Sequence, residues 1–175
     1  MYKRQVSGVI VDAVTGKGVA DANITAALAK ESGNGEMAEN GSARSKASGS
    51  YELKLGAGKY NVTVRKDGYI EETFSLEVKD KELKNQNFTI SPELGKGEIR
   101  IVLDWGASPR DLDAYLFADS VQNSYPVYFG DKGSQSKGAM LDIDDRDGYG
   151  PETISIYDTS RTWIYGVQDL SLIHI

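Results

Sequence analysis

The chain has 175 residues, no cysteine, and 26 acidic against 20 basic residues, which gives a net charge of −6 at pH 7. This negative charge argues against a surface that binds nucleic acid or an anionic membrane. The lack of cysteine excludes disulfides, thiol catalysis and cysteine-based zinc sites. No stretch of the sequence approaches the roughly 18 apolar residues of a membrane-spanning helix, so we expect no membrane insertion within this chain.

Both ends of the chain resemble translated sequencing-adapter sequence. Residues 1–5 and residues 170–175 match, in one frame, the two strands of a transposon end that is used to tag sequencing libraries. We therefore leave both segments out of the fold prediction and expect residues 6–169 to be an internal piece of a longer environmental gene. Without Lys3 and Arg4, this piece has 18 basic and 26 acidic residues, a net charge of −8, and the single histidine, His174, lies outside it.

Residues 6–92 are predicted to form a first β-sandwich of about seven short strands, because alternating apolar residues recur between turn signals. The clearest strands cover residues 6–11, 19–28, 51–55, 60–64, 72–78 and 85–90. The expected inward positions include Val19, Ala22, Ile24, Ala26, Tyr51, Leu53, Leu55, Tyr60, Val62 and Val64. Residues 31–48 are rich in Gly, Ser, Asn and Glu and lack periodicity, which predicts a long exposed loop. Residues 93–96 are predicted to be a linker.

Residues 6–92 resemble the carboxypeptidase regulatory-like domain, a prealbumin-like β-sandwich. The matching segments are Val6-Ser7-Gly8-Val9-Ile10, Thr15-Gly16-Lys17-Gly18-Val19-Ala20-Asp21-Ala22, Gly49-Ser50-Tyr51, Gly56-Ala57-Gly58-Lys59-Tyr60 and Asp67-Gly68-Tyr69. The glycines in them supply turn geometries that side chains disfavour. The resemblance implies an accessory domain without catalytic residues of its own. Where family members often carry Asp-Gly, this chain has Ser48-Gly49-Ser50, which gives no support for a metal at that turn.

Residues 97–169 are predicted to form a second β-sandwich domain that is incomplete at its C-terminus, so that a missing strand beyond Asp169 would leave an unpaired edge. Strands are expected over residues 99–105 and 127–130, with a further strand at Asp111-Leu112-Asp113-Ala114-Tyr115-Leu116. This domain resembles a family of uncharacterised bacterial secreted proteins, which pair a Trp-Gly…Asp-Leu-Asp strand with an Asp-Asp…Tyr-Gly-Pro-Glu loop. The Asp-Leu-Asp strand also resembles β-sandwich domains appended to secreted bacterial peptidases.

Aromatic residues are concentrated in the second domain, which contains six tyrosines, two tryptophans and two phenylalanines. Flat rings can stack on sugars or peptides, and neighbouring carboxylates can accept protons from sugar hydroxyls. The alternative is that these rings fill the core of a small β-sandwich. The candidate ligand-binding residues are Trp105, Tyr115, Tyr128 and Tyr149. Among them, Trp105 stands beside Asp104 and Gly106 at a strand end, where we expect it to be exposed.

Acidic residues in the second domain suggest a calcium site. The candidate ligands are Asp111, Asp113, Asp142, Asp144, Asp145 and Asp147, and Glu152 follows them in the sequence. Strand alternation places Asp111 with Asp113, and Asp142 with Asp144. Calcium prefers six to eight oxygen ligands and would relieve the repulsion between crowded carboxylates. The spacing is not that of an EF-hand, and the alternative is a set of turn residues that bond their own backbone amides.

Two functions of different classes fit this sequence. The first is a non-catalytic binding or adhesion module of a secreted or cell-surface protein, extracellular or periplasmic, with a glycan or protein ligand. The second is a structural spacer or accessory domain of a secreted peptidase or of an outer-membrane importer. We expect no enzyme, because residues 6–169 lack the His or Cys of common nucleophile systems, and nothing distinguishes Asp113 and Glu152 from structural acids.

Overall fold

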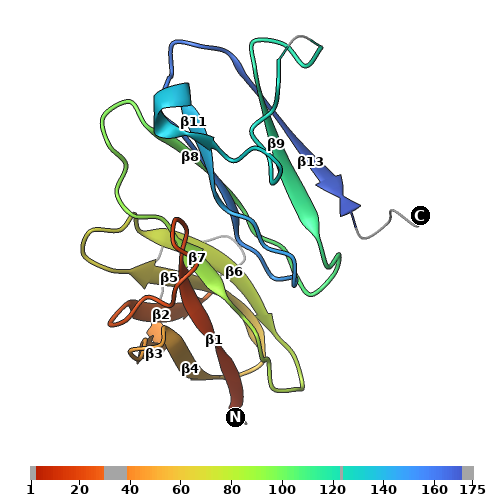
Figure 1. Cartoon of the computed structure of the whole chain (residues 1–175). Helices are drawn as coiled ribbons and strands as arrows, with labels where there is room; N and C mark the ends of the chain where they lie inside the picture. Colours follow the sequence, from red (N-terminus) through yellow and green to blue (C-terminus); the bar gives the residue numbers. More distant parts are fainter. Residues whose placement is uncertain (1–2, 30–38, 123, 171–175) are drawn as a thin grey trace. The chain divides into compact units, whose positions relative to one another are not determined.

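The computed structural model describes residues 3–29, 39–122 and 124–170, and it confirms the predicted all-β fold class (Figure 1). The chain divides into two compact units, the first formed by residues 1–12 and 17–93, and the second by residues 13–16 and 94–175. The described residues contain no helix that is long and apolar enough to cross a membrane.

The first unit is built from two β-sheets (Figure 1). Its seven described strands are β1 (Arg4–Asp12), β2 (Asn23–Leu28), β3 (Glu39–Arg44), β4 (Ser50–Leu55), β5 (Gly58–Arg65), β6 (Glu72–Val78) and β7 (Phe88–Ile90). One sheet has the order β4-β1-β7 and the other the order β3-β2-β5-β6. All pairs are antiparallel except β1 with β7, which run parallel from the Ile10–Phe88 pair to the Asp12–Ile90 pair.

The core of the first unit follows the predicted alternation. The ten expected inward positions, Val19, Ala22, Ile24, Ala26, Tyr51, Leu53, Leu55, Tyr60, Val62 and Val64, are all buried in one hydrophobic cluster. Alternate residues of a strand point to the same face, so each of these strands contributes one row to the core. Two aromatic rings, Phe74 and Phe88, stack with centroids 4.6 Å apart beside it.

One predicted loop of the first unit contains a strand. Residues 31–48 were expected to be a long exposed loop, but β3 occupies Glu39–Arg44 and pairs with β2. The pairing runs from Asn23 opposite Arg44 to Ala27 opposite Glu39, with a register irregularity near its end. Backbone hydrogen bonds can hold an edge strand that has no apolar alternation, which is why sequence periodicity missed it. Residues 31–38 lie outside the described part of the chain.

Two of the segments that carry the sequence resemblance, those around Gly8 and Tyr69, make specific contacts in the first unit. The backbone of Gly8 lies against that of Gln86, because a Cβ atom at position 8 would stand 2.0 Å from the Gln86 carbonyl oxygen. The hydroxyl of Tyr69 donates a hydrogen bond of 2.7 Å to Oδ2 of the buried Asp12. Burial, together with this bond to Asp12, raises the pKa of Tyr69 to about 12. The Asp67-Gly68-Tyr69 segment therefore anchors a turn to the end of β1.

The second unit also contains two sheets. Its elements are β8 (Ile99–Leu103), β9 (Leu112–Ala118), β10 (Gly133–Ser134), the short 3-10 helix η1 (Gln135–Lys137), β11 (Ala139–Ile143), β12 (Glu152–Ile156) and β13 (Trp163–Asp169). The sheets have the orders β10-β11-β12-β8 and β13-β9, and every pair is antiparallel. The predicted strand over residues 127–130 is reduced to two isolated bridges, Leu116 with Val127 and Tyr128 with Asp131.

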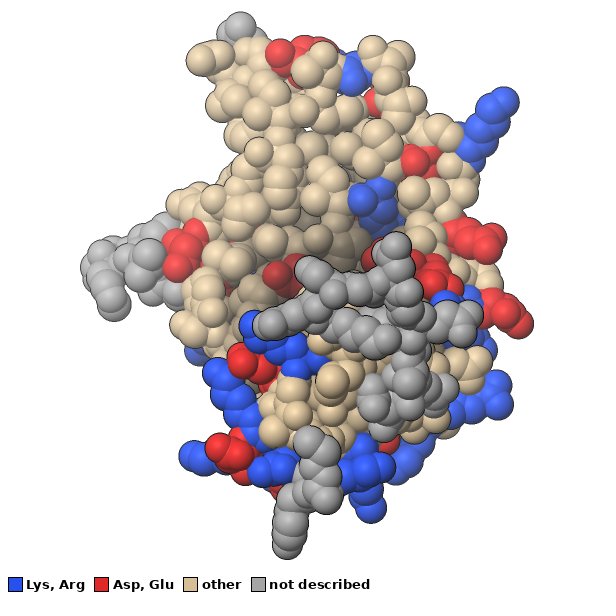
Figure 2. Space-filling model, turned by 180° about the vertical axis from the view of Figure 1, so that it is seen from behind, with Lys and Arg blue, Asp and Glu red and all other residues tan. Residues whose placement is uncertain are grey.

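The second unit carries the negative charge of the chain. Residues 94–175 contain 13 acidic and seven basic residues, whereas residues 1–93 contain 13 of each. In the face drawn in Figure 2, Lys and Arg gather over the lower part of the molecule, which is the first unit. The small core of the second unit consists of Ala114, Leu116, Ala139, Leu141, Ile154 and Ile156. Among the described residues, the second unit thus combines an excess of acidic side chains with a core cluster of six buried apolar residues.

Candidate functional site

Three carboxylates from distant parts of the sequence meet in the second unit. Asp113 lies on β9, Asp144 follows β11, and Glu152 begins β12. Each offers one carboxylate oxygen, and these three oxygens lie within 4.8 Å of one another. No other group of three potential metal-ligating residues this close occurs among the described residues. The three side chains form the centre of what we call the acidic cluster, which comprises Asp111, Asp113, Asp144, Asp145 and Glu152.

The strands explain how these side chains come together. Glu152 shares a face of β12 with Ile154 and Ile156, since alternate residues point the same way. Its carboxylate thus enters the end of the hydrophobic core, where Oε1 accepts a hydrogen bond of 2.7 Å from the backbone amide of Ala114. Asp113, next to Ala114 on β9, is brought to the same place. The cluster therefore connects the two sheets of the unit.

Asp113 and Glu152 are buried, the other three residues of the cluster are half-buried, and several carboxylate oxygens of the cluster lack a hydrogen-bond partner. Glu152 is 1% exposed, Asp113 is 2% exposed, and the side chain of Asp144 is 5% exposed. The buried oxygens without a partner are Glu152 Oε2, Asp113 Oδ2, Asp144 Oδ1, Asp111 Oδ1 and Asp145 Oδ2. A buried polar atom without a partner costs about 1–3 kcal/mol, and more when it is charged. So many unpartnered carboxylate oxygens close together indicate that the cluster binds a ligand or protons.

The protonation equilibria reflect the same crowding. Burial raises the pKa of Glu152 to about 8 against the opposing hydrogen bond from Ala114, and Asp113, Asp144 and Asp111 add to the rise. Burial also raises the pKa of Asp113 to about 6, with contributions from Asp111 and Asp144. The pKa of Asp145 is raised by burial as well. Without a cation, the cluster would thus bind protons more strongly than free carboxylates do.

Two basic side chains reach the cluster, but both contact the same atom. Lys132 Nζ lies 3.4 Å and Arg146 Nη2 lies 3.1 Å from Asp144 Oδ2. Two ionised carboxylates whose oxygens stand 4.8 Å apart, the limit found for Asp113, Asp144 and Glu152, repel each other by roughly 3–4 kcal/mol at an effective dielectric constant of about 20. The charge of Arg146 also acts to lower the pKa of Asp113, but neither cation forms an ion pair with Asp113 or Glu152.

Two of the predicted calcium ligands, Asp142 and Asp147, are not in the group of three oxygens formed by Asp113, Asp144 and Glu152. Burial raises the pKa of Asp142, while its neighbours Ser155 and Arg100 act to lower it. The β11–β12 register is irregular between Leu141 and Ile143, so the alternation that was expected to pair Asp142 with Asp144 is interrupted at Asp142. Asp147 is exposed and pairs with Arg110 at 3.3 Å. The structure brings together Asp111, Asp113, Asp144 and Asp145 but not Asp142 and Asp147.

Glu152 was absent from the predicted ligand set, although it is central to the cluster. The sequence did contain a signal for it. In Glu152-Thr153-Ile154-Ser155-Ile156, the acid occupies the position that alternation assigns to the same face as two isoleucines. An acidic residue in register with a core row is a stronger indication of a buried role than an aspartate in a turn.

Two of the predicted aromatic ligand residues belong to a continuous row of rings. Tyr115 stacks on Tyr128 with centroids 5.4 Å apart and on Phe117 at 6.4 Å, and Phe129 meets Tyr128 edge-on at 5.0 Å. We call these four residues the aromatic row. Tyr115 and Phe117 share one face of β9, opposite the buried Ala114 and Leu116. The row therefore lies outside the hydrophobic core of the unit.

The other two predicted aromatic residues lie in loops. Trp105 is half-buried rather than exposed, and its indole Nε1 donates a hydrogen bond of 2.9 Å to the Pro109 carbonyl. Tyr149 is half-buried in the left-handed region with φ of 73°, between Gly148 and Gly150, which also have positive φ. Neither residue is part of the aromatic row.

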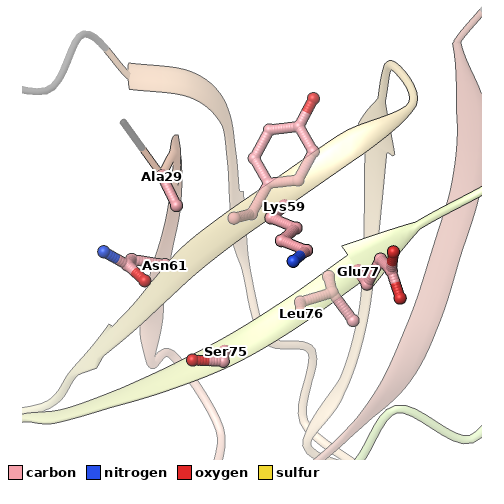
Figure 3. A pocket seen from close by; sticks show the side chains of 7 residues that line it. Ala29, Lys59, Asn61, Ser75, Leu76 and Glu77 are labelled. Atoms are coloured by element: carbon pink, nitrogen blue, oxygen red, sulfur yellow. The ribbon is translucent and has the colours of Figure 1, made fainter. Parts of the chain in front are cut away.

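Two hollows offer further space. One, of about 280 Å³ in the second unit, is bordered by Tyr125, Trp163, Arg161 and Lys137 among others, and Tyr125 is 96% exposed. The other, of about 410 Å³, lies over β5 and β6 of the first unit, where Figure 3 shows Lys59, Asn61, Ser75 and Glu77 around it. Neither hollow is lined by a residue of the acidic cluster.

Comparison with known proteins identifies the family of the first unit. Residues 5–91 match the family model of the carboxypeptidase regulatory-like domain, which confirms the resemblance noted in the sequence. No curated protein is significantly similar to the chain in sequence.

Similar solved structures are distant. A chain of a type II cohesin–X-dockerin complex from Acetivibrio cellulolyticus is 19% identical, with 51% of this chain and 58% of that chain covered and a TM-score of 0.34. The Bacillus anthracis TIE protein is 15% identical, with 97% and 29% covered and a TM-score of 0.42. A DUF3823 family protein from Parabacteroides merdae is 12% identical, with 88% and 80% covered and a TM-score of 0.38. The chain thus spans less than two thirds of the first two proteins, and these likenesses assign it no ligand.

Proposed function

We propose that this chain, whose residues 5–91 belong to the carboxypeptidase regulatory-like domain family, is a non-catalytic binding or adhesion module of a larger secreted or cell-surface protein. In this proposal, the first unit is an accessory β-sandwich. The second unit binds a glycan or protein ligand, and calcium stabilises its loops.

The observation that carries the proposal is the aromatic row. Rings of Tyr115 and Tyr128 stack outside the core, and burial raises the pKa of Tyr115. Its hydroxyl therefore stays protonated at neutral pH and is able to donate a hydrogen bond. A surface that combines ring faces with hydroxyls suits stacking on a sugar or on a peptide side chain. Phe129, which is 38% exposed, extends the row toward solvent.

The arrangement of carboxylates supports a non-catalytic role. Glycoside hydrolysis by two carboxylates requires both groups to flank a bound sugar. Asp113 and Glu152 are both almost completely buried, and the backbone amide of Ala114 occupies one oxygen of Glu152. A sugar cannot lie between them without opening the core. Their chemistry suits an ion better than a substrate.

Binding to an array of glycans, followed by titration of the best glycan into the full chain, tests the ligand proposal. Tyr115→Ala and Tyr128→Ala should each weaken binding about tenfold, because a contact with an aromatic ring is worth roughly 0.5–1.5 kcal/mol beyond the apolar area that it buries. Tyr125→Ala is the matched control, since Tyr125 is an exposed tyrosine outside the aromatic row. An array without any bound glycan, repeated with a peptide library, would favour the structural-spacer function. Equal losses for Tyr125→Ala and Tyr115→Ala would show that the ligand binds elsewhere.

A further inference from the structure

We infer that the second unit binds one calcium ion between Asp113, Asp144 and Glu152, with Asp111 and Asp145 as the nearest additional oxygen donors. This inference rests on the calcium stabilisation proposed above. It goes further by naming the ligands, by excluding Asp142 and Asp147, and by assigning the ion a structural task.

Buried oxygens without partners are the first argument. An acidic cluster on a protein surface is common and is solvated by water. Here Asp113 and Glu152 are 2% and 1% exposed, and Asp113 Oδ2 and Glu152 Oε2 have no hydrogen-bond partner. Asp144 adds a third such oxygen, Oδ1. These atoms are closed to bulk solvent, and one cation can satisfy all three together.

The spacing of the oxygens is the second argument. Calcium binds oxygen at 2.3–2.6 Å, so two ligands of one ion stand at most about 5 Å apart. The three carboxylate oxygens of Asp113, Asp144 and Glu152 lie within 4.8 Å of one another. All three can therefore contact a single calcium ion without a change in the backbone.

The chemistry of the donors is the third argument. Oxygen-only sites suit calcium, magnesium or manganese, whereas zinc, copper and iron favour nitrogen or sulfur ligands. The chain has no cysteine, and its one histidine, His174, lies outside the described residues. Magnesium retains several waters and requires near-ideal octahedral geometry. Side chains this deeply buried leave little room for those waters, which favours calcium.

Basic side chains do not complete the site. Lys132 and Arg146 both contact Oδ2 of Asp144, and their side chains are half or more exposed. Oδ1 of Asp144 remains without a partner, and no described basic side chain forms an ion pair with Asp113 or Glu152. The charge of Asp113 and Glu152 is thus left for an ion inside the cluster.

The ion would join three segments of the second unit. It would hold the start of β9, which belongs to one sheet, together with the residue after β11 and the start of β12, which belong to the other. The loop between Asp144 and Glu152 includes three consecutive residues with positive φ, Gly148, Tyr149 and Gly150. The chain has no disulfide, and the core cluster of the second unit has six buried apolar residues among those described. A bound ion that joins these three segments would therefore stabilise the folded second unit.

Isothermal titration of calcium chloride into the chelator-treated full chain tests the inference. We expect one ion per chain, and a Glu152→Gln variant should bind at least about tenfold more weakly. Asp142→Asn is the matched control, because Asp142 is a half-buried acidic residue that is not in the group of Asp113, Asp144 and Glu152, and the variant should bind calcium like the unmodified chain. Circular dichroism without calcium shows whether each variant is folded.

Several results would overturn the inference. These are no heat and no change in melting temperature with calcium, an Asp142→Asn variant as weak as Glu152→Gln, or magnesium binding as tight as calcium. The ligand test is independent. Calcium binding without glycan or peptide binding would leave the ion assignment intact and refute the binding surface, whereas the reverse would refute only the ion.

Discussion

The Oε1 atom of Glu152 accepts a hydrogen bond of 2.7 Å from the backbone amide of Ala114. This bond joins the first residue of β12 to β9, which belongs to the other sheet of the second unit. It satisfies one oxygen of Glu152 and leaves the other, Oε2, buried without a partner. The Glu152 side chain thus connects the two sheets through Oε1 and leaves Oε2 available to bind a cation.

The first prediction concerns Glu152→Gln without calcium. The substituted amide keeps an oxygen for the Ala114 amide and places NH₂ donors near the oxygens of Asp113 and Asp144. With a pKa of about 8, Glu152 must take up a proton when the ion-free chain folds at pH 7, whereas Gln is neutral in both states. The substitution should therefore stabilise the ion-free second unit by about 1–3 kcal/mol at pH 7. Urea unfolding in the presence of chelator measures this change. Glu77→Gln, at an exposed ion pair with Lys79 in the first unit, should shift stability by less than about 0.5 kcal/mol, and destabilisation by Glu152→Gln would contradict the prediction.

The second prediction concerns pH. The pKa of Glu152 is raised to about 8 and that of Asp113 to about 6 in the folded chain, so the folded state binds more protons than the unfolded state does. The stability that these groups contribute is therefore fully present below about pH 4, and it is lost as the pH rises toward 8. Thermal melts of chelator-treated protein from pH 4 to pH 8 should show a falling melting temperature for the second unit.

Calcium should remove this pH dependence at neutral pH, because the ion replaces the protons on the carboxylates. The melting temperature at pH 7.5 should therefore rise on calcium addition by more than it does at pH 4.5. A chelator-treated protein whose second unit is most stable at pH 8 would be incompatible with these pKa values.

A third prediction concerns the close backbone approach in the first unit. A Cβ atom at position 8 would stand 2.0 Å from the carbonyl oxygen of Gln86, so Gly8→Ala forces β1 away from residues 86 and 87. We expect a loss of about 1–3 kcal/mol in the free energy of unfolding of the first unit. Gly106→Ala is the control, since nothing lies within 4 Å of its Cβ position. A Gly8→Ala variant with an unchanged free energy of unfolding would show that β1 does not contact residues 86 and 87.

A fourth prediction concerns a buried hydroxyl. Ser45 Oγ accepts a hydrogen bond of 2.8 Å from the Ala22 amide and donates one of 2.7 Å to the Val19 carbonyl. Ser45→Ala leaves both backbone groups without this partner and should destabilise the first unit by about 1–3 kcal/mol. Ser48→Ala, at an exposed serine nearby, should be nearly neutral in the same denaturant titration. Equal effects of the two substitutions would rule out the structural role of Ser45.

The first unit could be predicted in most of its core from the sequence. Tyr51, Leu53 and Leu55 alternate with polar residues, and alternation alone decides which face is buried. The strand β3 could not be predicted in this way, because Gly41, Ser42 and Ala43 are small and its position depends on pairing with β2. Edge strands that are held by backbone bonds carry little information in their side chains.

The acidic cluster was only partly predictable, for a different reason. Asp111 and Asp113 lie close together as the alternation predicts, but Asp144 and Glu152 reach them through pairings between distant strands. The register irregularity at Asp142 could not be read from the sequence, so alternation alone could not separate Asp142 from Asp144. The aromatic row depends on the approach of Tyr128 to Tyr115, which is also a contact between distant segments.

The most direct test of the calcium assignment is anomalous diffraction from crystals of the full chain grown with calcium. The account predicts an anomalous peak inside the acidic cluster, about 2.3–2.6 Å from carboxylate oxygens of Asp113, Asp144 and Glu152. Asp142 and Asp147 should not contact it. Crystals in which the cluster shows no such peak, and in which the three carboxylates bond protons or each other instead, would contradict the assignment.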